Sequence, residues 1–232
     1  MHAVILAAGL GTRLLPHTQS RPKGMVPLAG RPLLEHTFGM LPDEVTEVVM
    51  VIGHLGSQVQ EYFGGEWYGR KISYVTQNPL NGTGGALHAA RRAVRGKFLV
   101  INGDDLYAKD DLQRLIVHPL GLLAAEAGHP VPESVVVGEN GRFLGLAADR
   151  DNNQGLVCAG AYVLDESFFN FPLVQIRGRG SVEYGLPHTI ALRASEEEIY
   201  VERATWWHQV GTLEQYEKAQ ELAVSLRGSG QL

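Results

Sequence analysis

The chain has 232 residues and a mass of 25.3 kDa, a size that one continuous α/β core can accommodate. Hydrophobic residues make up 44% and charged residues 19%, which excludes a disordered or fibrous chain. Twenty Lys and Arg against twenty-five Asp and Glu leave a net charge of −5, the wrong sign for a protein whose main partner is a nucleic acid.

Short apolar runs alternate with amphipathic stretches through the first half of the chain. This alternation is typical of βαβ units, in which helices cover both faces of a mainly parallel sheet. Most of the apolar runs are too uniformly hydrophobic for a sheet with one wet face, so we expect them in its centre. The predicted strands are 3–8, 47–52, 72–76 and 98–102, and the predicted helices are 32–41, 57–63 and 85–95.

The second half carries shorter β-like pieces separated by Gly and Asn turns. We expect these pieces, at 121–125, 135–137, 142–147 and 156–164, to form a mixed edge of the same sheet. Helices are predicted at 182–193 and 213–226, and residues 228–232 as a frayed tail. The pattern contains no repeat and no linker, so it predicts one α/β domain.

A few residues have a structural interpretation. Cys158 is the only cysteine, cannot form an intramolecular disulfide, and is interpreted as a core residue. Trp206 and Trp207 are interpreted as packing residues. The first apolar run lacks a cationic leader and is far shorter than the ~20 residues of a membrane span. We therefore expect a cytoplasmic protein without a membrane partner, and the sequence leaves a homo-oligomer open.

Two closely spaced glycines, Gly9 and Gly11, follow the first predicted strand. Backbone amides in such a turn converge on a phosphate, and Arg13 and Lys23 add enough positive charge for a triphosphate. The alternative is a tight turn with two solvated cations. The dinucleotide fingerprint would need a glycine at Leu14, and the Walker Gly-Lys-Ser/Thr is absent, so neither of those sites is predicted.

Residues 6–32, LAAGLGTRLLPHTQSRPKGMVPLAGRP, closely resemble the signature of the sugar-1-phosphate nucleotidylyltransferases. The resemblance continues at 77–86, 102–107 and 207–212, and therefore spans the chain from end to end. It implies a single Rossmann-like nucleotidyltransferase domain over residues 1–232. In that domain, residues 1–115 would bind the nucleotide and residues 116–227 the sugar.

The resemblance also implies individual roles. Arg13 would contact the phosphates of a nucleoside triphosphate, and Lys23 would lie at the reacting phosphates. Gln77 stands where members that use dTTP or UTP read the pyrimidine, and a side-chain amide offers the donor and acceptor that this needs. Gly82 would pass close to the base or ribose. The residues that the resemblance assigns to the nucleotide are Ala8, Gly9, Gly11, Thr12, Arg13, Gln77, Gly82 and Thr83.

A magnesium site is implied at the end of the strand at 98–102. Asp104 matches the aspartate that holds catalytic Mg²⁺, with a cap for a helix from about Ala108 as the alternative. Gln209 stands where the family usually has a second metal-binding aspartate, and its neutral amide is a weaker ligand. The resemblance thus implies Mg²⁺ as cofactor, Asp104 and Gln209 as ligands, and Arg13, Lys23 and Asp104 as catalytic residues.

The sugar side departs from the family pattern. The usual Glu-Lys-Pro segment should fall near residues 148–150 and is missing, which leaves Arg150 or Arg142 to supply the charge. Gly160 and Glu183 match family sugar contacts, with a purely structural role equally open for each.

Together these features predict transfer of a nucleotidyl group from a nucleoside triphosphate to a sugar-1-phosphate, with release of pyrophosphate and with dTTP or UTP favoured by Gln77. Two alternatives stay open. One is a cytidylyl- or guanylyltransferase acting on another phosphorylated acceptor. The other is a catalytically weakened nucleotide-sugar-binding homologue, which the neutral Gln209 would suit.

Overall fold

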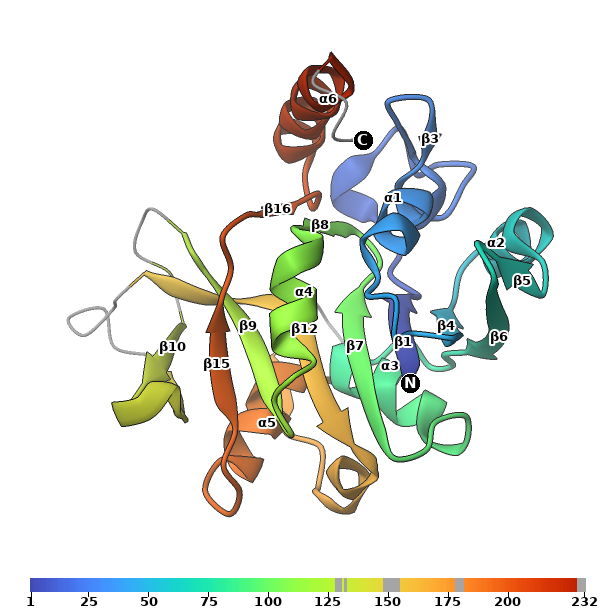
Figure 1. The fold of residues 1–232 in the computed structure, drawn as a ribbon. Coiled ribbons are helices and arrows are strands. Elements are labelled where there is room, and N and C mark those ends of the chain that lie inside the picture. Colours follow the sequence, from blue (N-terminus) through green and yellow to red (C-terminus); the bar gives the residue numbers. More distant parts are fainter. Residues whose placement is uncertain (128–130, 132, 148–154, 178–181, 229–232) are drawn as a thin grey trace.

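The computed structural model describes residues 1–127, 131, 133–147, 155–177 and 182–228. Its centre is a sheet of eight strands (Figure 1). In spatial order the strands are β15 (Tyr200–Arg203), β9 (Gly121–Glu126), β12 (Leu156–Asp165), β7 (Lys97–Asn102), β1 (His2–Ala7), β4 (Glu47–Ile52), β6 (Arg70–Thr76) and β5 (Glu66–Trp67).

The sheet is mixed and mainly parallel, which confirms the predicted fold class. Strands β6, β4, β1 and β7 run side by side in one direction, and these are the four strands predicted in the first half. Strand β12 runs antiparallel between β7 and β9, and β15 runs parallel to β9. The carboxyl ends of β1, β4, β6, β7, β9 and β15 therefore share one edge of the sheet, where open α/β sheets bind ligands.

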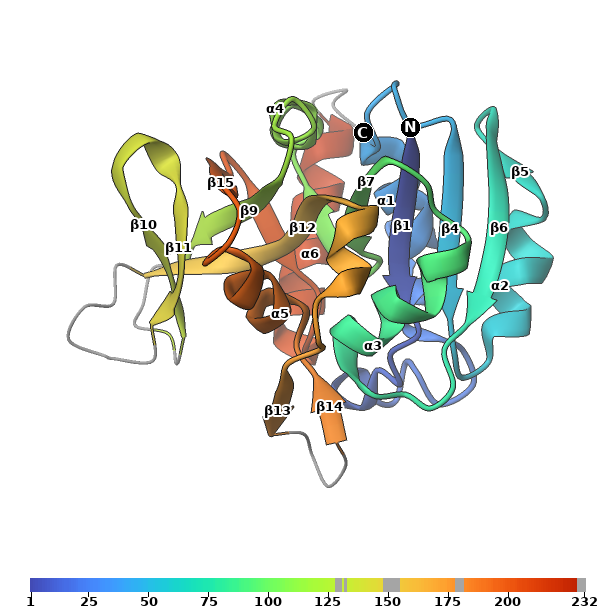
Figure 2. The ribbon, with the colours of Figure 1, turned by 90° about the horizontal axis from the view of Figure 1, so that it is seen from below.

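Helices cover both faces of the sheet, as expected (Figure 2). Alternate residues of β1 point to opposite faces, with Ile5 in one buried cluster and Val4 in the other. The first cluster includes side chains of α1 (Leu33–Met40), α2 (Gly56–Phe63) and α4 (Lys109–Leu115). The second includes side chains of α3 (Gly82–Ala89) and α5 (Leu186–Arg193).

The prediction of one helix over 182–193 is wrong in its first turn. Residues Val182–Tyr184 form strand β14, which pairs with β13 (Gln175–Arg177), and α5 begins only at Leu186. Pro187 in the first turn explains this start, because proline fits the beginning of a helix and not its interior. Likewise α3 begins earlier than predicted and is followed by a 3-10 turn, Ala90–Arg92.

The prediction for the sheet edge is also corrected. Strands β10 (Ser134–Val137) and β11 (Phe143–Ala147) form a separate antiparallel pair, and the edge is taken by β15, which was not predicted. Only four residues long and partly exposed, β15 carries too little apolar character to stand out in the sequence.

Helix α6 (Leu213–Gly228) packs against the segment that follows β1 (Figure 1). Ala219 and Ala223 pack with Leu14 and Leu28 in a third buried cluster, outside the sheet. The Tyr216 hydroxyl donates to the Pro27 carbonyl at 2.6 Å. Gly228, predicted in the tail, belongs to this helix, and residues 229–232 lie outside the described residues. No helix in the described part of the chain has the length and apolar character that crossing a membrane requires.

Candidate active site

The loop after β1 is held in a shape that only glycine permits at Gly11. Its φ is 66°, in the left-handed region that favours glycine. A Cβ there would lie 2.8 Å from Cγ2 of Thr18 and 3.1 Å from Cβ of Lys23. The Thr18 hydroxyl donates to the Gly11 carbonyl at 2.8 Å. The loop therefore folds back on itself, and this brings Lys23 beside the glycine turn, where a phosphate was predicted.

Lys23 and Asp104 meet across the carboxyl edge of the sheet. The Lys23 ammonium donates to Oδ2 of Asp104, and both side chains are largely buried, at 12% and 27% exposed. The alternative role of Asp104 as a helix cap is not realised. The residue before α4 is Ala108, and no side chain caps that helix. The structure thus brings together two predicted catalytic residues from segments 81 positions apart.

Gln209 and Arg13 lie near each other, next to Gly211. Strand β8 (Asp105–Tyr107) pairs with β16 (Trp207–Gln209), with Gln209 opposite Asp105, and the Val210 amide donates to the Asp104 carbonyl at 3.2 Å. A Cβ on Gly211 would lie 3.6 Å from the Gln209 amide carbon and 3.4 Å from Nη2 of Arg13. Arg13 and Gln209 therefore both lie next to Gly211, one residue from the Val210 amide that bonds the Asp104 backbone, and Asp104 in turn binds Lys23.

Asp105, next to Asp104, is electrostatically different from it. It is 1% exposed, and its Oδ2 accepts a hydrogen bond from the Asn102 amide at 3.1 Å. Burial, followed by the nearby Asp104 carboxylate, raises the pKa of Asp105 to about 8. At neutral pH Asp105 keeps its proton, so Asp104 is the carboxylate of this pair that is available to a cation.

The residues predicted to read the base form a compact turn after β6. Gln77 is buried, and its amide nitrogen donates to Oδ1 of Asn81 and to the Gly82 carbonyl, both at 3.0 Å. Two acceptors thus define which end of the Gln77 amide is the nitrogen. The Thr83 hydroxyl accepts from the Leu186 amide at 3.2 Å and so holds the start of α5.

The need for glycine at position 82 comes from β14. Gly82 has a φ of 89°, and a Cβ there would lie 2.6 Å from the Tyr184 carbonyl oxygen and 3.3 Å from Cβ of Glu183. The structure therefore places Glu183, a predicted sugar contact, directly beside the predicted base site.

Gly160, the other predicted sugar contact, lies within β12 at the end of β7. Its φ is 73°, and a Cβ there would clash with the Asn102 amide. Arg142 does not belong to this edge. It forms an ion pair with Glu198 at 3.1 Å and lies beside the start of β15, at the opposite ends of the strands from the site. The suggestion that Arg142 replaces the missing lysine is therefore wrong. Arg150 and the segment 148–150 lie outside the described residues.

The packing interpretations are confirmed. Cys158 packs against the second buried cluster, and burial, followed by the nearby Glu133 carboxylate, raises the pKa of its thiol to about 12. A thiol with that pKa carries almost no thiolate at neutral pH and is a poor nucleophile. Trp207 packs against the first cluster and Trp206 against the third.

A cavity of about 360 Å³ opens beside β16, at the carboxyl ends of β9 and β15. Glu126, Arg203 and Trp207 are among its lining residues. Neither Gly160 nor Glu183 lines it, so the cavity and the predicted sugar contacts are separate features of this edge.

Three residues that shape the site escaped sequence reasoning. Thr18 fastens the glycine loop, and Asn81 orients Gln77. Gly53 follows β4, and a Cβ there would lie 2.6 Å from the Ala8 carbonyl, so glycine lets the ends of β1 and β4 approach. Gly53 carried a readable signal, a glycine directly after a buried strand, and Thr18 and Asn81 lie within the two matched motifs, 6–32 and 77–86, without having been given a role there.

The oxygen donors fit a magnesium ion. Asp104 directly precedes β8, and Gln209 lies on the paired strand β16. Mg²⁺ is commonly held by one or two protein oxygens together with substrate phosphates and waters. In the part of the chain that the structure describes, no three His, Cys, Asp or Glu side chains gather around a common point. An ion at this site would therefore depend on the phosphates of a bound nucleotide.

Comparisons with known proteins agree with this geometry. Residues 2–119 match the family model described as nucleotidyl transferase. The chain is 34% identical over 174 residues to the bifunctional protein GlmU of Methanococcus maripaludis, covering 73% of this chain and 41% of that protein. It is 32% identical over 174 residues to the D-glycero-alpha-D-manno-heptose 1-phosphate guanylyltransferase of Campylobacter jejuni, covering 73% and 78%.

The fold is shared with the crystal structure of apo UDP-glucose pyrophosphorylase, with a TM-score of 0.81, 19% identity, and coverage of 97% of this chain and 98% of that one. The chain spans about half the length of the GlmU proteins that it matches. The family match over the half of the chain that carries the glycine loop, Lys23 and Asp104 identifies the chain as a member of the nucleotidyl transferase family.

Proposed function

We propose that this protein transfers a nucleotidyl group from a nucleoside triphosphate to a sugar-1-phosphate, and that it does so with Mg²⁺. The observation that carries the proposal is the convergence of Arg13, Lys23, Asp104 and Gln209 at the carboxyl edge of the sheet, beside the glycine turn. In the reaction, an oxygen of the sugar-1-phosphate attacks the α-phosphorus in line, and pyrophosphate leaves.

The chain's own contribution is charge and position. Lys23 is largely buried and is held by Asp104 before any substrate arrives, so its ammonium is preorganised toward the phosphates. Arg13, beside Gly211, adds a second cation at the rim. No covalent intermediate is required, in agreement with the packing role of Cys158.

Asp104 and Gln209 would hold Mg²⁺, which would neutralise phosphate charge during the transfer. For this the Lys23 ammonium must move from the Asp104 carboxylate to the phosphates, because one carboxylate oxygen cannot serve both cations equally well.

The arrangement of Gln77 supports dTTP or UTP. Its amide nitrogen is engaged by Asn81 and Gly82, which leaves its carbonyl oxygen as the acceptor for a base. The N3–H group of thymine or uracil is a matching donor. Guanine also offers a ring N–H, and one relative of this chain is a guanylyltransferase, so GTP is the second candidate.

On the acceptor side, we propose that Glu183 contacts sugar hydroxyls and that Gly160 offers backbone groups. The position of Glu183 supports this, because a Cβ on Gly82, in the proposed nucleotide site, would lie 3.3 Å from Cβ of Glu183.

A matrix of the five common nucleoside triphosphates against several sugar-1-phosphates, read by pyrophosphate release with and without Mg²⁺, tests the proposal. We expect release with dTTP or UTP and a loss of base preference in Gln77→Ala. Release with GTP alone would move the assignment to the guanylyltransferases. No release with any pair would favour the weakened binding homologue.

A further inference from the structure

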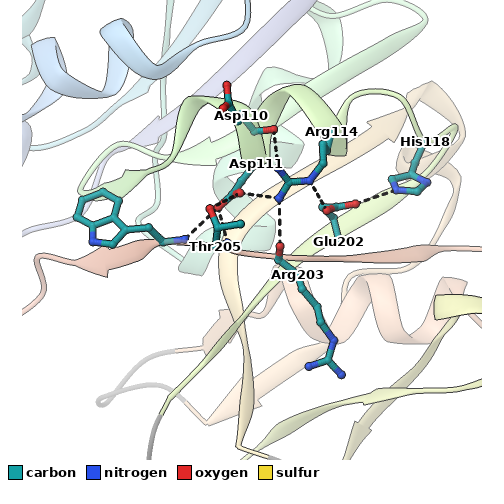
Figure 3. Close-up of polar contacts among 8 residues, drawn as sticks. Asp110, Asp111, Arg114, His118, Glu202, Arg203 and Thr205 are labelled. Atoms are coloured by element: carbon teal, nitrogen blue, oxygen red, sulfur yellow. Dashed lines mark hydrogen bonds and ion pairs between the residues drawn. The ribbon is translucent and has the colours of Figure 1, made fainter. Parts of the chain in front are cut away.

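The Asp111 carboxylate, outside the proposed site, accepts hydrogen bonds from a distant segment of the chain, Thr205 and Trp206. Asp111 lies in the first turn of α4, and its side chain is 0% exposed (Figure 3). Its Oδ2 accepts from the backbone amides of Thr205 and Trp206 at 2.8 and 3.2 Å. Its Oδ1 accepts from the Thr205 hydroxyl at 2.8 Å and from Nη2 of Arg114 at 2.6 Å. A buried carboxylate with four donors is fully satisfied and rigidly held.

The residues that Asp111 grips lead directly into the proposed site. Thr205 and Trp206 precede β16, which carries Gln209. The Ala108 amide donates to the Trp206 carbonyl at 3.2 Å, and the Val210 amide donates to the Asp104 carbonyl at 3.2 Å. Segment 205–210 is therefore attached along its whole length to segment 104–111, with Asp111 at one end and Asp104 at the other.

Strand β16 is also held by Trp207, which packs against the first buried cluster, and by Nε2 of His208, which lies 2.8 Å from the Gln215 carbonyl oxygen. The attachment to Asp111 matters because β16 is a short strand. It is three residues long and pairs only with β8, in a two-stranded sheet apart from the eight-stranded one. A pair of strands this short is marginal by itself, and a slip of one residue would turn the Gln209 side chain to the opposite face.

We propose that Asp111 is a positioning residue that sets the register of β16 on β8, and so keeps Gln209 opposite Asp105 and the Val210 amide on the Asp104 carbonyl. The inference rests on the proposed function for the importance of Gln209, but the register itself is a property of the chain alone. Asp111 contacts neither substrate nor metal. It acts through Thr205 and Trp206.

Hydrogen–deuterium exchange of the protein without metal or substrate tests the inference. In Asp111→Asn we expect segments 104–108 and 205–210 to exchange about tenfold faster. The Thr205 amide, the Trp206 amide and the Thr205 hydroxyl would then have a weaker acceptor or none. Strands β1 and β7 should exchange as before. Asp110→Asn is the matched control, since it removes the same charge one residue away, from an exposed side chain. The contact of Asp110 with Arg114 is made by its backbone carbonyl, so the substitution leaves it in place.

The second readout is the Mg²⁺ concentration that gives half-maximal pyrophosphate release. We expect it to rise about tenfold in Asp111→Asn and to stay unchanged in Asp110→Asn. Thr205→Val, which removes one donor and leaves the carboxylate, should show a smaller shift of the same kind. It provides the test if Asp111→Asn does not fold.

Unchanged exchange of 205–210 would overturn the inference. So would an equal acceleration over every strand, because Asp111 would then stabilise the fold as a whole. A wild-type protein that releases no pyrophosphate with any substrate pair would contradict the proposed function, and the exchange result would still decide whether Asp111 sets the register.

Discussion

Lys23 combines burial, charge and position in one side chain. It is 12% exposed and held against Asp104, so its ammonium already lies at the proposed site and has only to exchange the Asp104 carboxylate for the phosphates. We predict that Lys23→Ala lowers kcat/KM by about a hundredfold, since neutralising charge at the reacting phosphates is a leading catalytic effect. The measurement is steady-state pyrophosphate release. Lys109→Ala, which removes an exposed lysine paired with Asp43, should leave the rate unchanged, and a well-folded Lys23→Ala protein with normal turnover would contradict the proposed role.

Asp105 predicts a pH dependence of stability. Its pKa is about 8 in the folded protein, whereas an unfolded aspartate titrates near pH 4. Between these values the folded state binds the extra proton, so the free energy of unfolding falls as pH rises, by up to about 1.4 kcal/mol per pH unit from this group.

The contribution of Asp105 is the difference between the wild-type protein and Asp105→Asn, which cannot titrate. Urea denaturation of both from pH 5 to 8 in metal-free buffer measures it. We expect the wild-type curve to lose stability with rising pH relative to the variant. Parallel curves would mean that Asp105 is ionised in the folded state.

At the scale of elements, one guanidinium joins the end of α5 to the end of β12. The Arg193 side chain is 0% exposed. Its Nη2 donates to Oδ1 of Asp165 at 2.9 Å and to the Ser167 hydroxyl at 2.6 Å, and its Nε pairs with Glu197. The guanidinium carbon, Cζ, of Arg193 lies 5.6 Å from the centre of the Phe171 ring. The helix and the strand are thus tied together by one side chain.

We predict that Arg193→Ala lowers the free energy of unfolding by about 2 kcal/mol. The loss leaves two carboxylates without their partner, but both are partly exposed, at 42% and 35%, so water compensates for part of it. Urea denaturation measures the change, and Arg91→Ala, at an exposed arginine of the 3-10 turn after α3, is the control. Equal stability of the two variants would show that the Arg193 ion pairs contribute nothing.

At the scale of the whole molecule, the last helix packs against the segment that follows the first strand. Helix α6 buries Ala219 against the cluster that contains Leu14 and Leu28, on either side of Lys23 in the sequence. The Gln220 side chain also accepts from the Ala29 amide at 2.9 Å. The last helix therefore supports the loop that we propose binds the triphosphate.

We predict that Ala219→Asp undocks α6, because it buries a charge without a partner. The sheet should keep its circular-dichroism signature, while the dissociation constant of the preferred nucleoside triphosphate rises about tenfold. Isothermal titration calorimetry measures this, and Lys218→Asp, at the exposed neighbouring position, is the control. Unaltered nucleotide binding in Ala219→Asp would show that the loop does not need α6 in order to bind the nucleotide.

The sequence by itself determined the fold of the first half of this protein. Continuous apolar runs predicted the four parallel strands, and the glycine loop with Arg13 and Lys23 predicted a phosphate site, because hydrophobic periodicity and turn chemistry are local properties. Tertiary structure alone decided the sheet edge at β15, the separate pair β10–β11, the grip of Thr18 on Gly11, and the clamp by Asp111. These depend on pairings between segments up to 95 residues apart, and no local period records which distant strand or amide a side chain will meet.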